Sequence, residues 1–139
     1  MAYSAKAMEN RFRRNWLPYA RHVVSESTRD SHFSRQVQTL EGEIEVLKFE
    51  HDDNTWTSLT NLRLIGKLDE RLTSHVLDGE KLQVSYLDRA MTAVKKKEDY
   101  REIFAIRLNG DRDRTFYVDA DKAFALANVI NHLVDESNS

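Results

Sequence analysis

Apolar residues near the N-terminus recur at steps of three and four. This spacing predicts a helix with one apolar face, formed by Ala5, Met8, Phe12 and Trp16. Basic side chains surround that face: Lys6, Arg11, Arg13 and Arg14. Pro18 is expected to end this helix, because proline disfavours helical geometry in the preceding residue and lacks a backbone donor.

The pattern over residues 41–51 fits two structures. A helix would align four apolar side chains: Val37, Leu40, Ile44 and Leu47. A strand would align two apolar pairs with one change of phase between them: Ile44 with Val46, and Leu47 with Phe49. A β-bulge produces such a change of phase, and we favour the strand.

The stretch 59–66, LTNLRLIG, is the most apolar part of the middle of the chain. Together with the preceding TWTS it is rich in residues that prefer a pleated surface. Its apolar density indicates burial on both sides. We therefore predict one central strand over residues 55–65.

Two short motifs predict hairpins. Asp78-Gly79 lies between HVL at 75–77 and EKLQV at 80–84, and Asn109-Gly110 lies between 103–108 and 115–118. Such pairs readily adopt the positive φ angles of a two-residue turn. In the second hairpin, five side chains are expected to share a buried face: Phe104, Ile106, Leu108, Phe116 and Val118. Residues 90–94 are predicted to supply a further strand.

The chain ends in a predicted amphipathic helix. Asp119 is expected to cap its N-terminus, and Asp121 to lie in its first turn, where an acid complements the helix dipole. The apolar face predicted for this helix contains Ala123, Phe124, Ala127, Ile130, Leu133 and Val134.

The net charge of −2 conceals two unlike regions. Residues 1–40 carry 7 Lys/Arg and 3 Asp/Glu, whereas residues 41–139 carry 14 and 20. We divide the chain into a basic helical arm, 1–40, and a folded domain, 41–139. The acidic domain disfavours a broad nucleic-acid surface, which needs clustered cations. The absence of cysteine suits a reducing compartment, so a cytoplasmic location is expected.

About seven short strands followed by one helix predict an α+β fold. We expect a bent antiparallel sheet or open barrel that the C-terminal helix caps and a helical extension precedes.

This order of elements, together with the motifs LTNLRLIG and FYVDADKAFALANVINHL, resembles the bacterial pleckstrin-homology-like (PH-like) and GRAM-like domains over residues 43–136. The segment 84–91 departs from that family because it lacks the family's proline. Members of this family bind lipids, peptides or proteins, or oligomerise, so the resemblance assigns no single ligand.

The sequence contains no recognisable catalytic or cofactor-binding motif. The five histidines are scattered without the i, i+4 spacing of a helical zinc site, so no metal site is expected. Asp111-x-Asp113 and Asp119-x-Asp121 lack the glycine and glutamate that close a calcium loop. We therefore predict a non-enzymatic protein with no cofactor.

Two groups of residues are candidates for binding. The arm residues Met8, Arg11, Phe12, Arg13 and Trp16 are predicted to contact a protein partner or a second copy of the chain, with a membrane surface as an alternative. Removal of residues 1–40 is expected to leave a folded monomer. A weaker alternative for the arm is single-stranded nucleic acid.

The second group is a basic cluster in the acidic domain, formed by Lys95, Lys96, Lys97 and Arg101. It is a candidate site for an anionic ligand such as a lipid headgroup or nucleotide. The favoured interpretation is a solvated turn, because Glu98, Asp99 and Glu102 partly neutralise it.

Overall fold

The computed structural model describes residues 3–15, 22–26, 30–87, 104–119 and 122–133. It is an α+β fold with two antiparallel sheets. The first sheet has the order β1-β2-β3-β4, formed by Glu45–Asp52, Thr55–Thr60, Arg63–Leu68 and Arg71–Val76. The second has the order β5-β6-β7, formed by Val84–Leu87, Phe104–Leu108 and Thr115–Val118.

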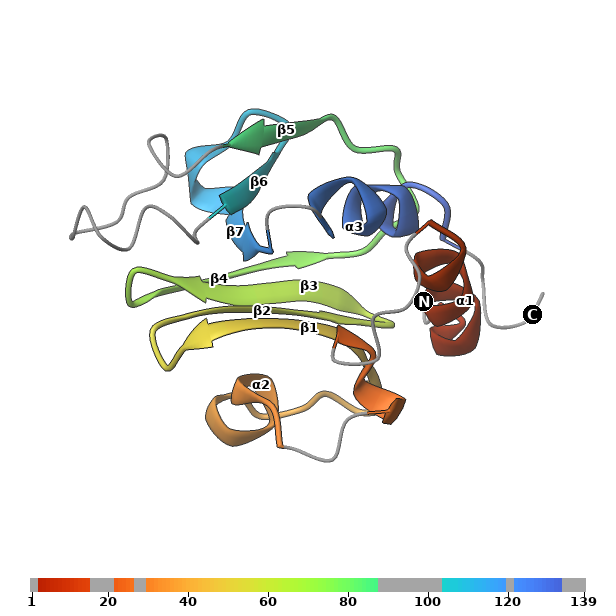
Figure 1. Cartoon of the computed structure of the whole chain (residues 1–139), viewed down its shortest axis with the longest axis horizontal. Helices are drawn as coiled ribbons and strands as arrows, with labels where there is room; N and C mark the ends of the chain where they lie inside the picture. The colour runs from red at the N-terminus through yellow and green to blue at the C-terminus, as the bar shows by residue number, and fades with distance from the viewer. Residues whose placement is uncertain (1–2, 16–21, 27–29, 88–103, 120–121, 134–139) are drawn as a thin grey trace.

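The helices cover the first sheet on both faces and at one end (Figure 1). The short α2, His32–Gln36, lies on one face, whereas α3, Ala123–Ile130, and the second sheet lie on the other. The helix α1, Ala5–Asn15, packs against α3 and β1. Strand β7 lies against β2 and β3. Seven strands and a C-terminal helix were expected, but the strands form two sheets rather than one bent sheet or barrel.

The strand predicted at 41–51 is confirmed as β1, and so is its bulge. The register with β2 shifts between Glu45 and Leu47, where the change of phase was expected. Beyond this shift, Leu47 and Phe49 face the main core, and Lys48 and Glu50 lie on the face that α2 covers. The extra residue explains why the strand alternates imperfectly in sequence.

The single strand predicted over 55–65 is wrong, because LTNLRLIG contains a hairpin turn. β2 ends at Thr60 and β3 begins at Arg63. The Thr60 hydroxyl accepts hydrogen bonds from the backbone N–H groups of Leu62 and Arg63. Threonine and asparagine side chains stabilise turns in this way without glycine or proline, which is why the apolar pattern concealed this one.

Asp78-Gly79 does not close a hairpin. β4 precedes it and pairs with β3, whereas β5 follows it and pairs with β6, so this segment crosses between the two sheets. The hairpin that β4 does form turns at Asp69 and Glu70, whose φ angles are 48° and 73°. Both non-glycine residues occupy the left-handed region that this type of turn requires.

The second predicted hairpin is confirmed. β6 and β7 are antiparallel, with Ile106 opposite Phe116, and the turn begins at Asn109 with φ 53°. Ile106, Leu108, Phe116 and Val118 are all buried. The loop is longer than two residues because a 3-10 turn, η5, occupies Arg112–Arg114. The strand predicted at 90–94 lies outside the described residues.

The C-terminal helix is confirmed, but its predicted cap is wrong. The residue at the N-cap is Lys122, which makes no side-chain cap hydrogen bond. Asp119 instead contacts His22 and accepts a hydrogen bond from Tyr117. Phe124, predicted on the buried face, is 65% exposed, because the helix turns Ala125, Leu126 and Val129 toward the core.

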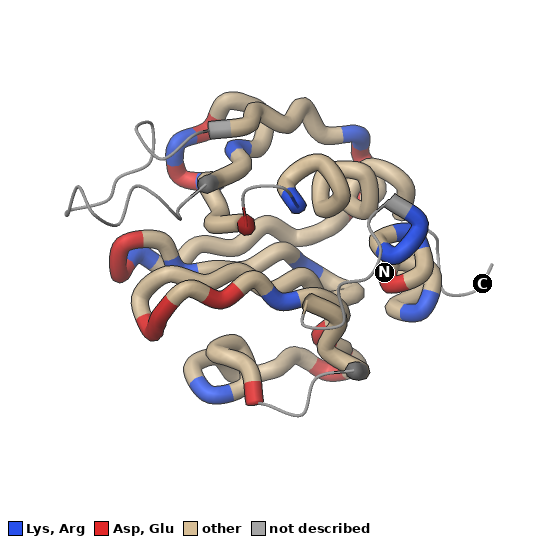
Figure 2. Tube along the Cα trace, viewed as in Figure 1, with Lys and Arg blue, Asp and Glu red and all other residues tan. Residues whose placement is uncertain are grey.

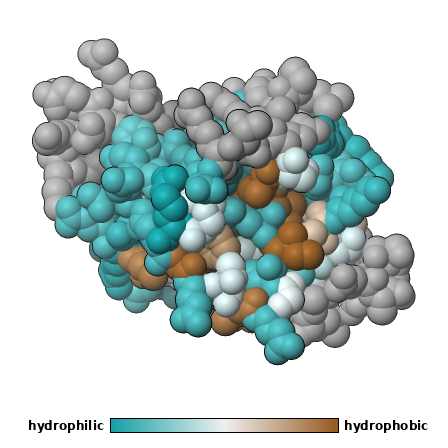
Figure 3. All heavy atoms as spheres, turned by 90° about the horizontal axis from the view of Figure 1, so that it is seen from below, coloured by the Kyte–Doolittle hydropathy of each residue, from teal (hydrophilic) through white to brown (hydrophobic). Residues whose placement is uncertain are grey.

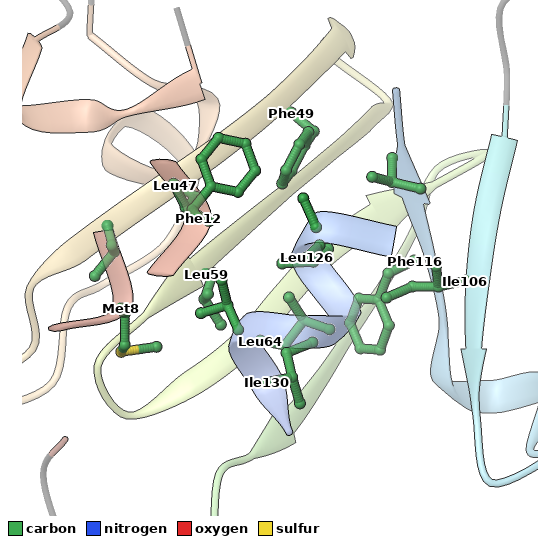
Figure 4. Close-up of a cluster of buried hydrophobic side chains, with 14 of the residues drawn as sticks. Met8, Phe12, Leu47, Phe49, Leu59, Leu64, Ile106, Phe116, Leu126 and Ile130 are labelled. Atoms are coloured by element: carbon green, nitrogen blue, oxygen red, sulfur yellow. The ribbon is translucent and has the colours of Figure 1, made fainter. Parts of the chain in front are cut away.

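The main core joins α1, both sheets and α3 (Figure 4). Met8 and Phe12 come from α1 and lie 2% and 0% exposed against side chains of β1 and β2. The rings of Phe12 and Phe49 meet edge to face at 6.2 Å. The apolar face of α1 therefore forms part of the same core as the two sheets and α3.

Candidate functional site

The predicted arm residues are engaged within the chain where the structure describes them. Met8 and Phe12 are buried, so they do not present an apolar face to a partner. Arg11 donates a hydrogen bond to Asn128 of α3, and Arg13 pairs with Glu9 at 3.0 Å. Trp16 lies outside the described residues, as do Lys95, Lys96, Lys97 and Arg101. A role of the helix in assembly stays a prediction.

A polar cluster on the α2 side of the first sheet was not found from sequence. It brings together Glu43 and Glu45 at the start of β1, Ser58 and Thr60 of β2, and Arg63 of β3. Figure 2 shows acidic and basic positions interspersed along this sheet. The one sequence signal for this cluster is that Glu43 and Glu45 are two positions apart, which places their side chains on the same face of an extended strand.

Glu43 is held by a fork of hydrogen bonds. Its side chain is fully buried and accepts from Arg63 Nε at 2.8 Å and from Arg63 Nη2 at 3.0 Å. Thr60 and the backbone N–H of Leu40 donate as well. Burial works to raise the pKa of Glu43, but these hydrogen bonds together with the charge of Arg63 outweigh it and hold the pKa below its ordinary value.

Glu45 has the opposite balance. Burial raises its pKa by more than the hydrogen bonds from Ser31 and Ser58 lower it. These bonds measure 2.6 and 2.5 Å, and Ser31 is also the N-cap of α2. Glu45 therefore ties α2 to the sheet. Because protein donors occupy both oxygens of each carboxylate, the cluster is organised to hold β1, β2, β3 and α2 together.

A second internal contact joins distant parts of the chain. The ring of His22 stacks on Phe49 at 4.9 Å; its Nδ1 lies 3.0 Å from the carbonyl of Lys48, and its Nε2 lies 3.0 Å from Asp119 Oδ2. Both partners are oxygen acceptors, one a backbone carbonyl and the other a carboxylate. This places the segment before α2 against β1 and the end of β7.

The two edges of the first sheet differ. At the β1 edge, Val23 forms a bridge with Leu47, and register shifts interrupt β1 at two places. Charged side chains also line this strand: Glu45, Lys48 and Glu50. Bridges, bulges and charges are the features by which proteins prevent a sheet edge from pairing with another chain.

The β4 edge has no bridge or bulge among the described residues, and its only formal charge is Arg71 at the start of the strand. No described strand pairs with its outer side, and residues 72–76 contain no Lys, Arg, Asp, Glu or Pro. Leu72 and Val76 are 53% and 68% exposed. Their register opposite Lys67 and Arg63 places them on the α2 side, where Figure 3 shows separate apolar areas among hydrophilic ones.

The opposite side of β4 contacts η5. The hydroxyl of Thr73 donates to the Asp113 carbonyl, Arg71 pairs with the Asp113 carboxylate, and Arg114 donates to His75 Nδ1. Burial lowers the pKa of His75, and the charge of Arg114 lowers it further. The neutral ring therefore carries its proton on Nε2, which is buried without a partner in the described part of the chain.

Within the described ranges, no group of His, Asp or Glu is arranged to hold a metal ion. No described helix is long and apolar enough to cross a membrane. Comparison with models of protein families, with curated proteins and with solved structures gave no match. The open β4 edge is thus the most distinctive surface of the described structure. The sequence signal for this strand is the placement of Leu72, Ser74 and Val76 at every second position, directly after the turn at Asp69-Glu70.

Proposed function

We propose that this protein is a non-enzymatic interaction module that binds a protein segment through the β4 edge of its first sheet. The observation that carries this proposal is the contrast between the two edges: β1 is blocked by Val23, bulges and charges, whereas β4 exposes Leu72 and Val76. An extended segment added to such an edge gains backbone hydrogen bonds, and its alternate side chains supply specificity.

The relation to PH-like and GRAM-like domains belongs to the same proposal. Seven antiparallel strands followed by a C-terminal helix support it, as do the sequence motifs around LTNLRLIG and the last helix. The cysteine-free sequence supports a cytoplasmic location.

Selection from a library of random peptides tests the proposed edge. We expect the full chain to select peptides with alternating apolar residues, and these to bind the Leu72→Lys variant at least about tenfold more weakly. A lysine on an edge strand opposes strand addition. Phe124→Lys is the matched control, because Phe124 is also an exposed apolar residue but lies on α3. Peptides that bind the two variants equally would contradict binding through β4.

A further inference from the structure

We infer that the segment bound at the β4 edge is β4 of a second copy of this chain, paired antiparallel about a two-fold axis that passes beside Ser74. The inference rests on the proposed function and names its partner. It would join two four-stranded sheets into one continuous sheet, with Leu72 of each copy opposite Val76 of the other.

The backbone of β4 is oriented for this register. The N–H of Leu77 donates to the carbonyl of Leu62, which continues the register that sets Val76 opposite Arg63, so Leu77 directs its backbone groups toward β3. These directions alternate along an antiparallel strand, so Leu72, Ser74 and Val76 direct theirs to the open edge. Pairing through Ser74 makes these three positions the hydrogen-bonded ones in both copies, which gives about six new backbone hydrogen bonds.

The side chains of β4 are symmetric about Ser74. The order from 72 to 76 is Leu, Thr, Ser, His, Val, with an apolar residue at each end and a small residue in the middle. Antiparallel pairing through Ser74 therefore sets apolar side chains opposite one another on the exposed face. With no formal charge between 72 and 76, no like charges meet across the axis.

The other face of β4 adds a donor and an acceptor from η5. The Asp113 carbonyl accepts from Thr73, whereas the Asp113 carboxylate pairs with Arg71 of the same chain and Arg114 donates to His75. The same register sets Thr73 opposite His75 of the second copy. It thus brings the Asp113 carbonyl of one copy to the side of the cationic donor Arg114 of the other, twice by symmetry. A partner of another sequence would not reproduce this reciprocity, which is why the observations favour a second copy.

A cysteine on the axis tests the register. The chain has no cysteine, so Ser74→Cys introduces a single thiol. Hydrogen-bonded antiparallel partners have Cα atoms about 5.5 Å apart, within the range that a disulfide spans. Under mild oxidant we expect a cross-linked dimer that reductant dissolves. Lys81→Cys, an exposed position in the crossover, is the control and should stay monomeric under the same conditions.

The solution mass tests the assembly without a cross-link. By light scattering, the mass of the full chain is expected to rise with concentration from 16.3 kDa toward twice that value. Val76→Lys should keep it at 16.3 kDa. Ser74→Pro should do the same, because the lost N–H points away from β3 and proline is tolerated on such an edge. Phe124→Lys should leave the association unchanged.

The outcomes separate the inference from the proposed function. A chain that stays monomeric with Ser74→Cys uncross-linked, yet selects peptides at the β4 edge, overturns pairing with a second copy and leaves the proposed function standing. A dimer that persists in both Val76→Lys and Ser74→Pro also overturns the inference, because another surface then forms it. A monomer without edge-dependent peptides overturns both.

Discussion

At the scale of single residues, Glu43 and Glu45 show how the same side chain acquires opposite properties two positions apart. Both are withdrawn from water on one face of the sheet. Glu43 faces the guanidinium of Arg63, so its ionised form is favoured and its pKa is lowered. Glu45 has only hydroxyl donors at hydrogen-bond distance, so burial prevails and its pKa is raised. Lys48 weakens that effect without reversing it.

These shifts predict two opposite trends of stability with pH. The pKa of Glu43 is below its ordinary 4.5 in the fold, so its contribution to stability is present above 4.5 and is lost as the pH falls through the folded value. The pKa of Glu45 is above 4.5, so its contribution is present at low pH and is lost as the pH rises through the folded value.

Urea unfolding of Glu43→Gln and Glu45→Gln between about pH 3 and pH 7 measures these trends. At neutral pH, Glu43→Gln should lower the free energy of unfolding by about 3 kcal/mol, because the charge of Arg63 stays buried. Glu45→Gln should change it by less than about 1 kcal/mol, because the amide oxygen accepts from one serine hydroxyl and the amide nitrogen donates to the other. Each variant should lack its own trend and retain the other; equal profiles for both would contradict the assignment.

At the scale of elements, Asn61 decides where β2 ends. It is 1% exposed, and its side-chain oxygen accepts from the N–H of Ile44 at 2.7 Å while its amide donates to the carbonyl of Gly42. Its own backbone carbonyl accepts from the N–H of Tyr3, just before α1. One side chain therefore replaces a strand partner at the start of β1 and lets the chain reverse.

Asn61→Ala is expected to destabilise the protein by about 1–3 kcal/mol, because it removes two part-buried hydrogen bonds, to the N–H of Ile44 and to the carbonyl of Gly42. Thermal or urea unfolding measures this loss. Asn10→Ala, at an exposed position of α1, is the control and should change stability by less than about 0.5 kcal/mol. If both variants behaved alike, the turn would not depend on the side chain of Asn61.

At the scale of the whole molecule, the described parts of the N-terminal forty residues belong to the fold. Met8, Phe12 and Val23 belong to the main core, and Phe33 forms the small core beneath α2 with Trp56 and Ile65. The guanidinium of Arg63 lies 6.0 Å from the Phe33 ring. The segment therefore covers one end and one face of the first sheet.

A chain that begins at Glu41 is accordingly expected to be unfolded, in contrast to the folded monomer predicted from sequence. Loss of a single buried aromatic side chain costs about 3–5 kcal/mol, and a typical domain has only about 5–15 kcal/mol of stability. Circular dichroism and amide exchange measure the outcome. Phe12→Ala should lower stability by about 3–5 kcal/mol, whereas Lys6→Ala, exposed on the same helix, should not. A folded, cooperative chain from Glu41 would show that the arm is independent after all.

Local patterns predicted the fold best where neighbouring residues alone decide. The bulge in β1, the hairpin of β6 and β7, and the C-terminal helix followed from periodicity and from Asn109-Gly110. The turn at Asn61, the crossover at Asp78-Gly79, and the start of β4 with its pairing to β3 did not. In these segments the backbone N–H and carbonyl groups form hydrogen bonds with residues far away in the sequence. No local pattern identifies those partners.

By itself, the sequence determined the α+β class, the apolar face of the first helix and the charge contrast between the two regions, because periodicity and composition are local properties. Only the tertiary structure decided what that helix covers and that the pKa values of Glu43 and Glu45 shift in opposite directions. It also decided that, among the described strands, β4 rather than β1 has the open edge. Burial, charge partners and strand neighbours are set by residues far apart in the chain, so they exist only once the chain has folded.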